Sequence, residues 1–358
     1  MFEDLALDIS PRAASVYFGL ALGVAFGALA QLTKFCLRRA VVGVGQDGKS
    51  ARGVWAMAFA VALVGTQLAV AQGWIGFGDH RFHLSAVPVL AILTGGLIFG
   101  VGAVMARGCI SRLTVLTGAG NLRALAALFV FAVAAHATLK GVFGPIRTGL
   151  ASFTSELGDG ATLAGLPGGA VVWTLALAVI ALFVVIRSGA SLLSLAGAAL
   201  LGLLVPVGWI GTGFVLFDEF DPINLESLSF TSPWAETLFW GITSSAIEPG
   251  FGVGLIGGVI AGAIVAALGS GQFRWQSFEA PAQMGRSLFG AALMGIGGVL
   301  AGGCTVGAGL AGIPTLSVAA LLALVAMIAG MAGAGEVDRI LSRRDARSSG
   351  AAGAVPAE

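Results

Sequence analysis

The chain has 358 residues, of which 57% are hydrophobic and 10% are charged, with a formal net charge of +1 and a mean hydropathy of +0.96. Soluble domains carry about 25% charged residues, so this composition excludes an ordinary soluble domain and indicates an integral membrane protein. The near-neutral charge gives no sign of a nucleic-acid partner, and three cysteines without CxxC spacing predict neither a disulfide framework nor a zinc site. We expect no cofactor, because the sequence contains no P-loop and its GxGxxG match at 252–257 lies inside an apolar stretch.

Nine apolar stretches are long enough to cross a bilayer, which takes about 18–20 residues. They cover residues 14–33, 53–73, 86–106, 122–139, 169–186, 192–217, 251–270, 285–303 and 315–335. A weaker stretch over 232–247 predicts a short re-entrant or interfacial helix. The sequence therefore predicts an all-α polytopic membrane protein. We expect residues 1–335 to form one transmembrane domain and residues 336–358, which are charged and rich in Gly and Ala, to form a disordered cytoplasmic tail.

The charged loops predict the orientation of the chain. Lys and Arg gather in residues 34–52, 107–123 and 339–347, whereas Asp and Glu gather in residues 3–8 and 218–226. Basic loops stay in the cytoplasm, so nine spans place the N-terminus outside and the C-terminus inside.

Residues 95–109 and 290–304 form an internal repeat that aligns without gaps. The identical pairs are Gly95/Gly290, Gly100/Gly295, Gly102/Gly297, Val104/Val299, Ala106/Ala301, Gly108/Gly303 and Cys109/Cys304. The predicted topology runs the first copy inward and the second copy outward. The pattern is typical of the inverted, pseudo-two-fold repeats of transporters, whose substrate site lies at the repeat interface. The first repeat covers about 14–140 and the second about 192–335.

The three cysteines are the leading candidates for the substrate path. Cys36 follows the first span, and Cys109 and Cys304 end the two repeat helices, directly after Gly108 and Gly303. A lone membrane cysteine is most often a small buried hydrophobe, but the repeat-related positions favour a built site. Glycine lets the backbone open so that N–H groups meet an anion, and a thiol is a weak donor and soft acceptor. This chemistry suits a polarisable anion that contains sulphur.

Arg107 and Glu248 are further candidates for the path. Arg107 adjoins Gly108 and Cys109 and would attract an anion, although basic loop residues also serve simply to set topology. Glu248 lies where the 251–270 span begins, so it is either a functional ionisable group or a carboxylate that stabilises a helix N-terminus.

Histidines and glycines give weaker signals. His80 and His83 have metal-like spacing without further ligands, so we expect them to be solvated loop residues. His136 lies within a span and would either relay protons or bond a neighbouring helix. Two glycine series at four-residue spacing predict close helix packing; they are Gly19, Gly23 and Gly27, and Gly254, Gly258 and Gly262.

The motifs FCLRR at Cys36, ARGC at Cys109 and AGGC at Cys304, with GWIGTG at 208–213, resemble the YeeE/YedE family of bacterial sulphur-compound transporters. The resemblance covers nearly the whole chain. It implies an hourglass-shaped protein of the bacterial inner membrane, with nine spans and an inverted repeat. It also implies uptake of thiosulfate, which passes between the three cysteine thiols, and not an enzymatic reaction. A sulphur-carrier protein of the TusA type, or a rhodanese-like protein, would then be a separate cytoplasmic partner.

Three other functions stay open from the sequence. The chain would fit a transporter of another small solute, such as a selenium compound. A membrane thiol or persulfide oxidoreductase would require paired cysteines, but Cys304 and Cys109 are expected at opposite ends of their spans unless the helices break near the midplane. A membrane assembly factor would give no reason for cysteines at repeat-equivalent positions.

Overall fold

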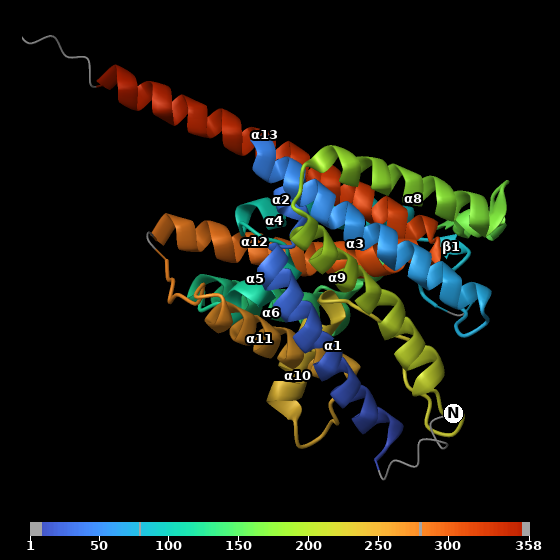
Figure 1. Ribbon diagram of the computed structural model, residues 1–358. Coiled ribbons are helices and arrows are strands. Elements are labelled where there is room, and N and C mark those ends of the chain that lie inside the picture. Colours follow the sequence, from blue (N-terminus) through green and yellow to red (C-terminus); the bar gives the residue numbers. More distant parts are fainter. Residues whose placement is uncertain (1–8, 79, 279–280, 353–358) are drawn as a thin grey trace, which may run out of the picture.

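The computed structural model describes residues 9–78, 80–278 and 281–352 and is almost entirely helical (Figure 1). The α-helices are α1 (Pro11–Thr33), α2 (Leu37–Val42), α3 (Gly45–Ala71), α4 (Val89–Met105), α5 (Ile110–Gly118), α6 (Leu122–Lys140), α7 (Gly144–Ala151), α8 (Gly169–Ser188), α9 (Leu192–Ile210), α10 (Thr231–Thr243), α11 (Phe251–Gly269), α12 (Pro281–Leu300) and α13 (Val318–Ala352). Short 3-10 helices are η2 (Gly158–Ala161), η3 (Leu163–Gly165) and η6 (Ile313–Thr315), and π-helices are η4 (Gly211–Val215) and η5 (Thr305–Gly312). The strands β1 (Ala86–Val87) and β2 (Ser155–Glu156) pair antiparallel.

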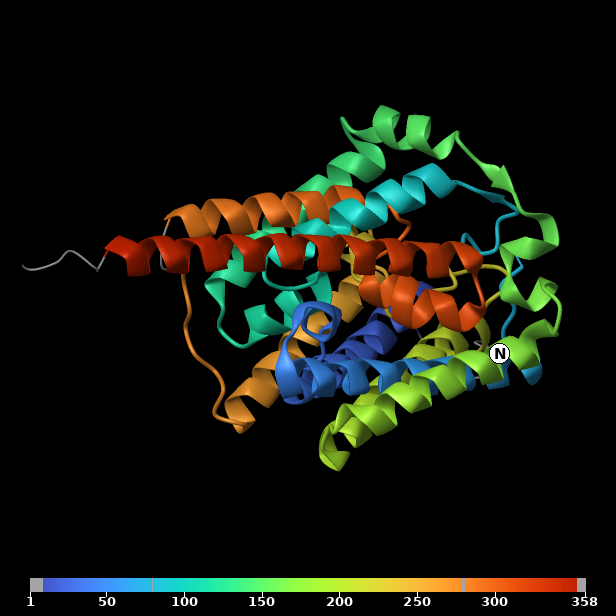
Figure 2. The ribbon, with the colours of Figure 1, turned by 90° about the horizontal axis from the view of Figure 1, so that it is seen from above.

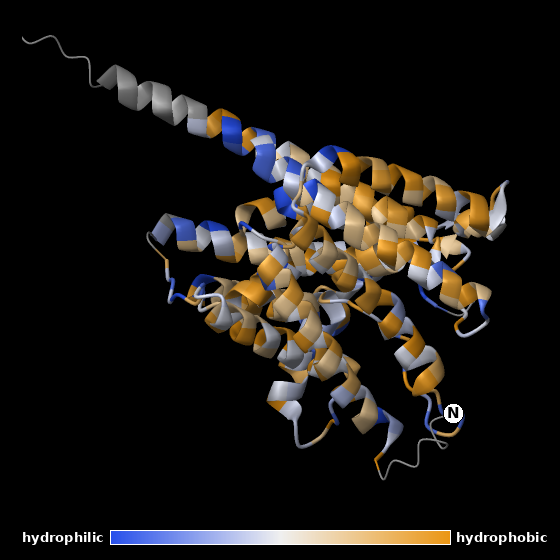
Figure 3. Cartoon of the chain, in the orientation of Figure 1, coloured by the Kyte–Doolittle hydropathy of each residue, from blue (hydrophilic) through white to orange (hydrophobic). Residues whose placement is uncertain are grey.

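Within the described residues, nine helical spans are long and apolar enough to cross a bilayer. They are Pro11–Val42, Gly45–Ala71, Val89–Gly118, Leu122–Lys140, Gly169–Ser188, Leu192–Val215, Phe251–Gly269, Gln283–Thr315 and Val318–Ser342. Hydrophobic residues predominate in these membrane-spanning helices (Figure 3). The all-α, nine-span prediction is confirmed. The short helix expected over 232–247 corresponds to α10, and α13 runs on to Ala352, into the segment predicted as a tail.

Three of the spans are each broken by a non-helical step that ends at a cysteine. α1 gives way to α2 at Cys36, α4 to α5 at Cys109, and α12 to η5 at Cys304. In all three steps the residue two positions before the cysteine has a left-handed backbone: φ is 53° at Lys34, 60° at Arg107 and 74° at Gly302. A left-handed residue ends a helix, so each cysteine can cap the helix that follows.

The glycine series hold α1 directly against α11. A Cβ atom added at Gly19, Gly23 or Gly27 would collide with the backbone of α11, and one added at Gly254, Gly258 or Gly262 would collide with the backbone of α1. The small-residue packing predicted from the sequence is confirmed.

The repeat helices α4 and α12 pack against each other in a reciprocal way. Gly95 lies against the backbone of Gly297, and Gly102 lies against the backbone of Gly290. Because Gly95 aligns with Gly290 and Gly102 aligns with Gly297, each contact is the symmetry counterpart of the other. A two-fold axis produces self-complementary contacts of this kind.

The remaining helix pairs follow the same correspondence. The contact of α1 with α11 corresponds to the contact of α9 with α3. In the same way, the contact of α2 with α3 corresponds to that of α10 with α11, and the contact of α13 with α4 corresponds to that of α6 with α12. An inverted repeat predicts this set of contacts. In such a repeat, α5 is equivalent to η5, and α2 is equivalent to α10. Seen from above, α4, α12 and α13 lie together, while α8 runs along the margin of the bundle (Figure 2).

Candidate functional site

The helix breaks bring the three cysteines together inside the bundle. All three are free and buried, and each is the N-cap of the helix that follows it. The thiols of Cys36 and Cys109 interact with each other, and Cys304 is close enough to Cys109 for electrostatic interaction. The expectation that Cys109 and Cys304 lie at opposite ends of their spans is wrong, because both spans break at the cysteine.

Hydrogen-bond donors surround these thiols. The sulphur of Cys304 accepts the N–H of Gly307 at 3.4 Å, and the sulphur of Cys109 lies 3.3 Å from the hydroxyl oxygen of Ser111. The backbone of Phe230, the N-cap of α10, also reaches Cys304. Because the N-termini of α5, η5 and α10 carry free N–H groups and a partial positive charge, this region favours an anion.

Three hydroxyl groups beside the cysteines make no hydrogen bond of standard geometry with the described residues, although that of Thr305 interacts with the Cys109 thiol. They are the buried side-chain oxygens of Ser229, Thr231 and Thr305. Thr305 adjoins Cys109 in space, and Ser229 lies against Gly307, where any side chain at position 307 would meet it. An unsatisfied buried hydroxyl costs free energy, so a cluster of them indicates groups kept ready for a ligand.

A cation lies on the other side of the thiols. Arg112 interacts electrostatically with Cys36 and Cys109, and its Nη1 donates to the Gln31 side-chain oxygen at 3.4 Å. The amide of Gln31 donates in turn to Gln272 at 3.1 Å, so the loop after α11 closes this end of the site. By the predicted orientation this is the cytoplasmic end.

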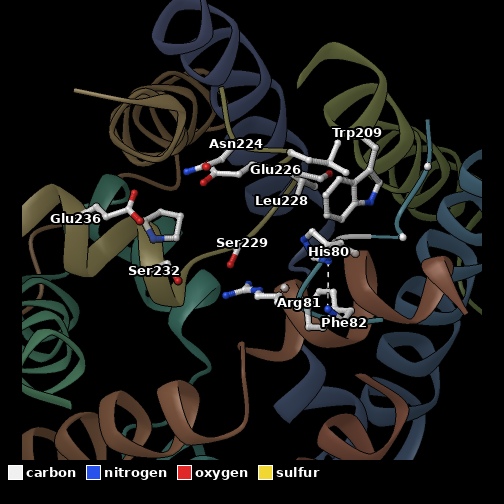
Figure 4. A pocket seen from close by; sticks show the side chains of 17 residues that line it. His80, Arg81, Phe82, Trp209, Asn224, Glu226, Leu228, Ser229, Ser232 and Glu236 are labelled. Atoms are coloured by element: carbon white, nitrogen blue, oxygen red, sulfur yellow. Dashed lines mark hydrogen bonds between the residues drawn. The ribbon is translucent and has the colours of Figure 1, made fainter. Parts of the chain in front are cut away.

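A cavity of about 690 Å³ opens toward the opposite face, which is the predicted outer face. Arg81 extends into it (Figure 4), and its guanidinium carbon lies 5.1 Å from the centre of the Phe82 ring. Ser229 and Gly307 also line the cavity, which connects it to the surroundings of Cys304. Among the described residues, no carboxylate lies within ion-pair distance of the Arg81 guanidinium. The arrangement offers the Arg81 charge to an anion entering from that face, while Glu226 and Glu236 act on that charge from beyond ion-pair distance.

The cavity also contains two carboxylates and a histidine. Burial raises the pKa of Glu226 to about 7, and the nearby Glu236 carboxylate adds to the rise. Burial lowers the pKa of His80 to about 4, with further contributions from Arg81 and His83, so His80 is neutral at physiological pH. Burial lowers the pKa of Arg81 as well, but an arginine stays protonated under these conditions.

The other predicted site residues lie in different places. Gly108 and Gly303 are buried directly before their cysteines, whereas Arg107 is exposed and caps the end of α4 in the left-handed conformation. The carbonyl oxygen of Glu248 accepts a hydrogen bond from Arg12 at 2.9 Å beside a second cavity of about 460 Å³, whose lining contains no cysteine. The structure therefore groups the cysteines with the glycines and leaves Arg107 and Glu248 outside the group.

The histidines differ from their prediction. His80 lines the cavity, and His83 Nε2 lies 3.0 Å from the Thr315 carbonyl oxygen, so the expectation of solvated loop histidines is wrong. His136 stacks on Phe239, with ring centres 4.9 Å apart.

Arg81, Arg112 and the unpartnered hydroxyls were not predicted from the sequence. Arg81 stands between the two histidines of DHRFH, whose metal-like spacing is the stronger pattern there. Arg112 lies in the first turn of α5, three positions after the N-cap Cys109, and this short spacing is the sequence signal that would have indicated it.

A family model described as sulphur transport matches residues 32–333. A thiosulfate transporter, TsuA, from Spirochaeta thermophila is 27% identical over 322 residues, which cover 85% of this chain and 93% of that protein. A thiosulfate transporter, TsuA, from Escherichia coli is 27% identical over 325 residues, which cover 82% of this chain and 86% of that protein.

Proposed function

Because the chain belongs to the sulphur transport family, we propose that this multi-pass membrane protein takes up thiosulfate from the face that carries its N-terminus. The names of its relatives support this substrate, and the reciprocal packing of the repeats supports an inverted-repeat transporter. The basic loops support a bacterial inner membrane with the C-terminus in the cytoplasm.

The observation that carries the proposal is the line of groups from the outer cavity to the inner end. It begins at Arg81, passes Ser229 and Gly307 to Cys304, and continues through Cys109 and Cys36 to Arg112. A positive group stands at each end, and the three thiols lie between them. We infer that the anion moves along this line in that order.

The chemistry of the line matches thiosulfate. This dianion has three oxygens at one end and a terminal sulphur at the other, and S–H groups donate weak hydrogen bonds to such a sulphur. The backbone N–H groups and the unpartnered hydroxyls suit the oxygens. Each step must bind weakly, because a deep binding site would hold the ion. The proposed path requires no covalent bond to the thiols, which agrees with the transporter function in the names of the relatives.

Uptake of radiolabelled thiosulfate by cells that lack their own uptake systems tests the proposal. We expect Cys109→Ala and Cys304→Ala to reduce uptake by at least about tenfold at equal membrane expression, because each removes a hydrogen-bond donor from the proposed path. Thr117→Val is the matched control: it lies on the same helix, and its hydroxyl donates only to Leu113 O within that helix. Wild-type uptake in the two alanine variants would overturn the path.

The interaction of Cys36 with Cys109 favours a thiol or persulfide oxidoreductase as the second candidate. That function needs the Cys36–Cys109 pair but not Cys304. The variants Cys36→Ala and Cys304→Ala therefore separate the two functions. A transporter loses thiosulfate uptake in both variants, whereas an oxidoreductase keeps its redox activity in Cys304→Ala.

A TusA-type sulphur carrier or rhodanese-like partner would receive the anion at the cytoplasmic face. Competition by selenium compounds would identify a different solute.

A further inference from the structure

Two carboxylates share the outer cavity with Arg81. Glu226 and Glu236 both line it, and both act electrostatically on the Arg81 side chain, although neither forms an ion pair with it. Glu226 is fixed by Thr212, whose hydroxyl donates to the Glu226 carbonyl oxygen at 2.7 Å and accepts its N–H at 3.0 Å. An anion held at Arg81 would therefore lie beside two groups that repel it when they are ionised.

We propose that the outer cavity binds a proton together with the anion, and that Glu226 is the residue that takes up the proton. This inference rests on the proposed function and adds a coupling ion to it. The proton comes from the outside solution and forms the neutral carboxylic acid, so no other reactant is required.

The charges in the cavity favour this assignment. With Glu226 ionised, Arg81 faces two negative charges before a dianion arrives, and the dianion would bring two more. Protonation of Glu226 leaves Arg81 opposite Glu236 alone, and it converts an acceptor into an O–H donor that suits an anion.

Neighbouring cations explain why Glu226 takes the proton and not Glu236. Glu226 and Glu236 also line the second cavity. Four further charged residues line that cavity: Arg12, Lys140, Asp221 and Glu248. Lys140, Arg81 and Arg12 all act to lower the pKa of Glu236. Among the described cations, Arg81 alone does so for Glu226, where a hydrogen bond with the Asn224 side chain also lowers the pKa. Burial nevertheless raises the pKa of both groups.

The histidines do not account for a pH effect in the working range. Burial lowers the pKa of His80 to about 4, and burial also lowers the pKa of His83. Both rings are therefore neutral when Glu226 titrates. Burial raises the pKa of Glu226 to about 7, and an anion beside it would shift that pKa further upward.

Calorimetric titration of thiosulfate into the purified full-length protein tests the proposal. Repeating the titration at pH 7.5 in buffers of different ionisation enthalpy gives the number of protons bound with each anion. At pH 7.5 a carboxyl group with a pKa of about 7 is about three-quarters ionised, so we expect wild type to take up at most about three-quarters of a proton per anion. We also expect a dissociation constant that is flat below about pH 6 and rises by up to about tenfold per pH unit above 7.

Glu226→Gln should bind thiosulfate with almost no proton uptake and little dependence on pH. Glu219→Gln is the matched control, because Glu219 is exposed in the same loop and lines neither cavity; it should behave as wild type. Thiosulfate binding to wild type without proton uptake would overturn the proton linkage alone, and so would undiminished proton uptake in Glu226→Gln. Absence of thiosulfate binding to wild type would overturn the proposed function and the linkage with it.

Discussion

Arg81 gives the outer cavity its positive charge. Its position over the Phe82 ring holds the guanidinium at the cavity wall, beyond ion-pair distance of every described carboxylate, so the charge can meet an anion. Arg81→Gln should raise the KM for thiosulfate uptake by about tenfold or more, and Arg81→Lys should recover part of the loss because it restores the charge but not the planar geometry. Kinetics of uptake at equal expression measure both effects.

Arg187 provides the control for Arg81. Its guanidinium carbon lies 4.6 Å from the centre of the Phe183 ring, a similar stacking at the end of α8. Arg187→Gln should leave the KM unchanged. An equal effect of both substitutions would show that the stacked arginine matters for folding and not for the anion.

Thr305 should show opposite effects on stability and transport. Its buried hydroxyl makes no hydrogen bond of standard geometry with the described residues, and a group of this kind costs about 1–3 kcal/mol, so Thr305→Val should keep or raise the thermal stability while it lowers uptake. Thr114→Val is the contrast, because the Thr114 hydroxyl accepts Trp234 Nε1 at 2.9 Å and donates to Ile110 O. It should lower the melting temperature. Reduced stability in Thr305→Val would argue against a ligand-binding hydroxyl.

At the scale of single residues, the sequence identified the thiols but not the groups around them. Cys109 and Cys304 stood out because they share a repeat position. Ser229 and Thr305 look like ordinary small polar residues of a membrane protein, and their significance lies in the absence of a hydrogen bond of standard geometry with the described residues. That absence depends on the whole set of neighbours, which no local pattern contains.

At the scale of helices, the contact of α1 with α11 requires glycine only on the face of α11 that lies against α1. Gly258→Val should abolish or strongly reduce the folded protein, because its side chain would collide with the backbone of α1 at Leu20. Gly257→Val is one position away, where the nearest atom to an added Cβ is 3.9 Å distant, so it should be tolerated. Fluorescence-detected gel filtration of both variants gives the answer. Equal profiles would contradict the packing.

The spans themselves were predictable, but their breaks were not. The apolar stretch predicted over 86–106 ends with α4 and leaves out α5, and hydropathy says nothing of the left-handed backbone at Arg107, where one span continues from α4 into α5. A left-handed lysine or arginine has no reliable sequence signal, since most residues with positive φ are glycine. The convergence of the cysteines therefore needed the structure.

At the scale of the whole molecule, the predicted orientation can be tested with thiol labels. In a variant with Cys36, Cys109 and Cys304 replaced by alanine, Phe220→Cys should react with a membrane-impermeant maleimide in intact cells with a permeable outer membrane. Ser342→Cys should react only after the inner membrane is opened, because α13 carries it to the cytoplasmic side. Both positions are exposed, so access to the thiol does not limit the reaction. The reverse pattern would invert the topology and the direction of transport.

The two halves of the molecule are similar in packing but not in chemistry. α2 corresponds to α10, so the N-cap Cys36 of α2 corresponds to the N-cap Phe230 of α10. The start of α10 therefore has no thiol, and the hydroxyls of Ser229 and Thr231 flank it. The start of α10 therefore offers donors for oxygen, and the start of α2 offers a second thiol for sulphur.

The three broken spans have a consequence for which anions can pass. Irregular backbone at this depth is tolerated only when protein surrounds it, and Cys109 and Cys304 are 1% and 0% exposed. An ion at the thiols has therefore given up nearly all of its hydration shell. Sulphate has the same charge as thiosulfate but carries a hard oxygen in place of the terminal sulphur, so the thiols would compensate it poorly for the lost water. On the proposed path, the breaks would therefore select anions by polarisability, which neither the size nor the charge of an ion reveals.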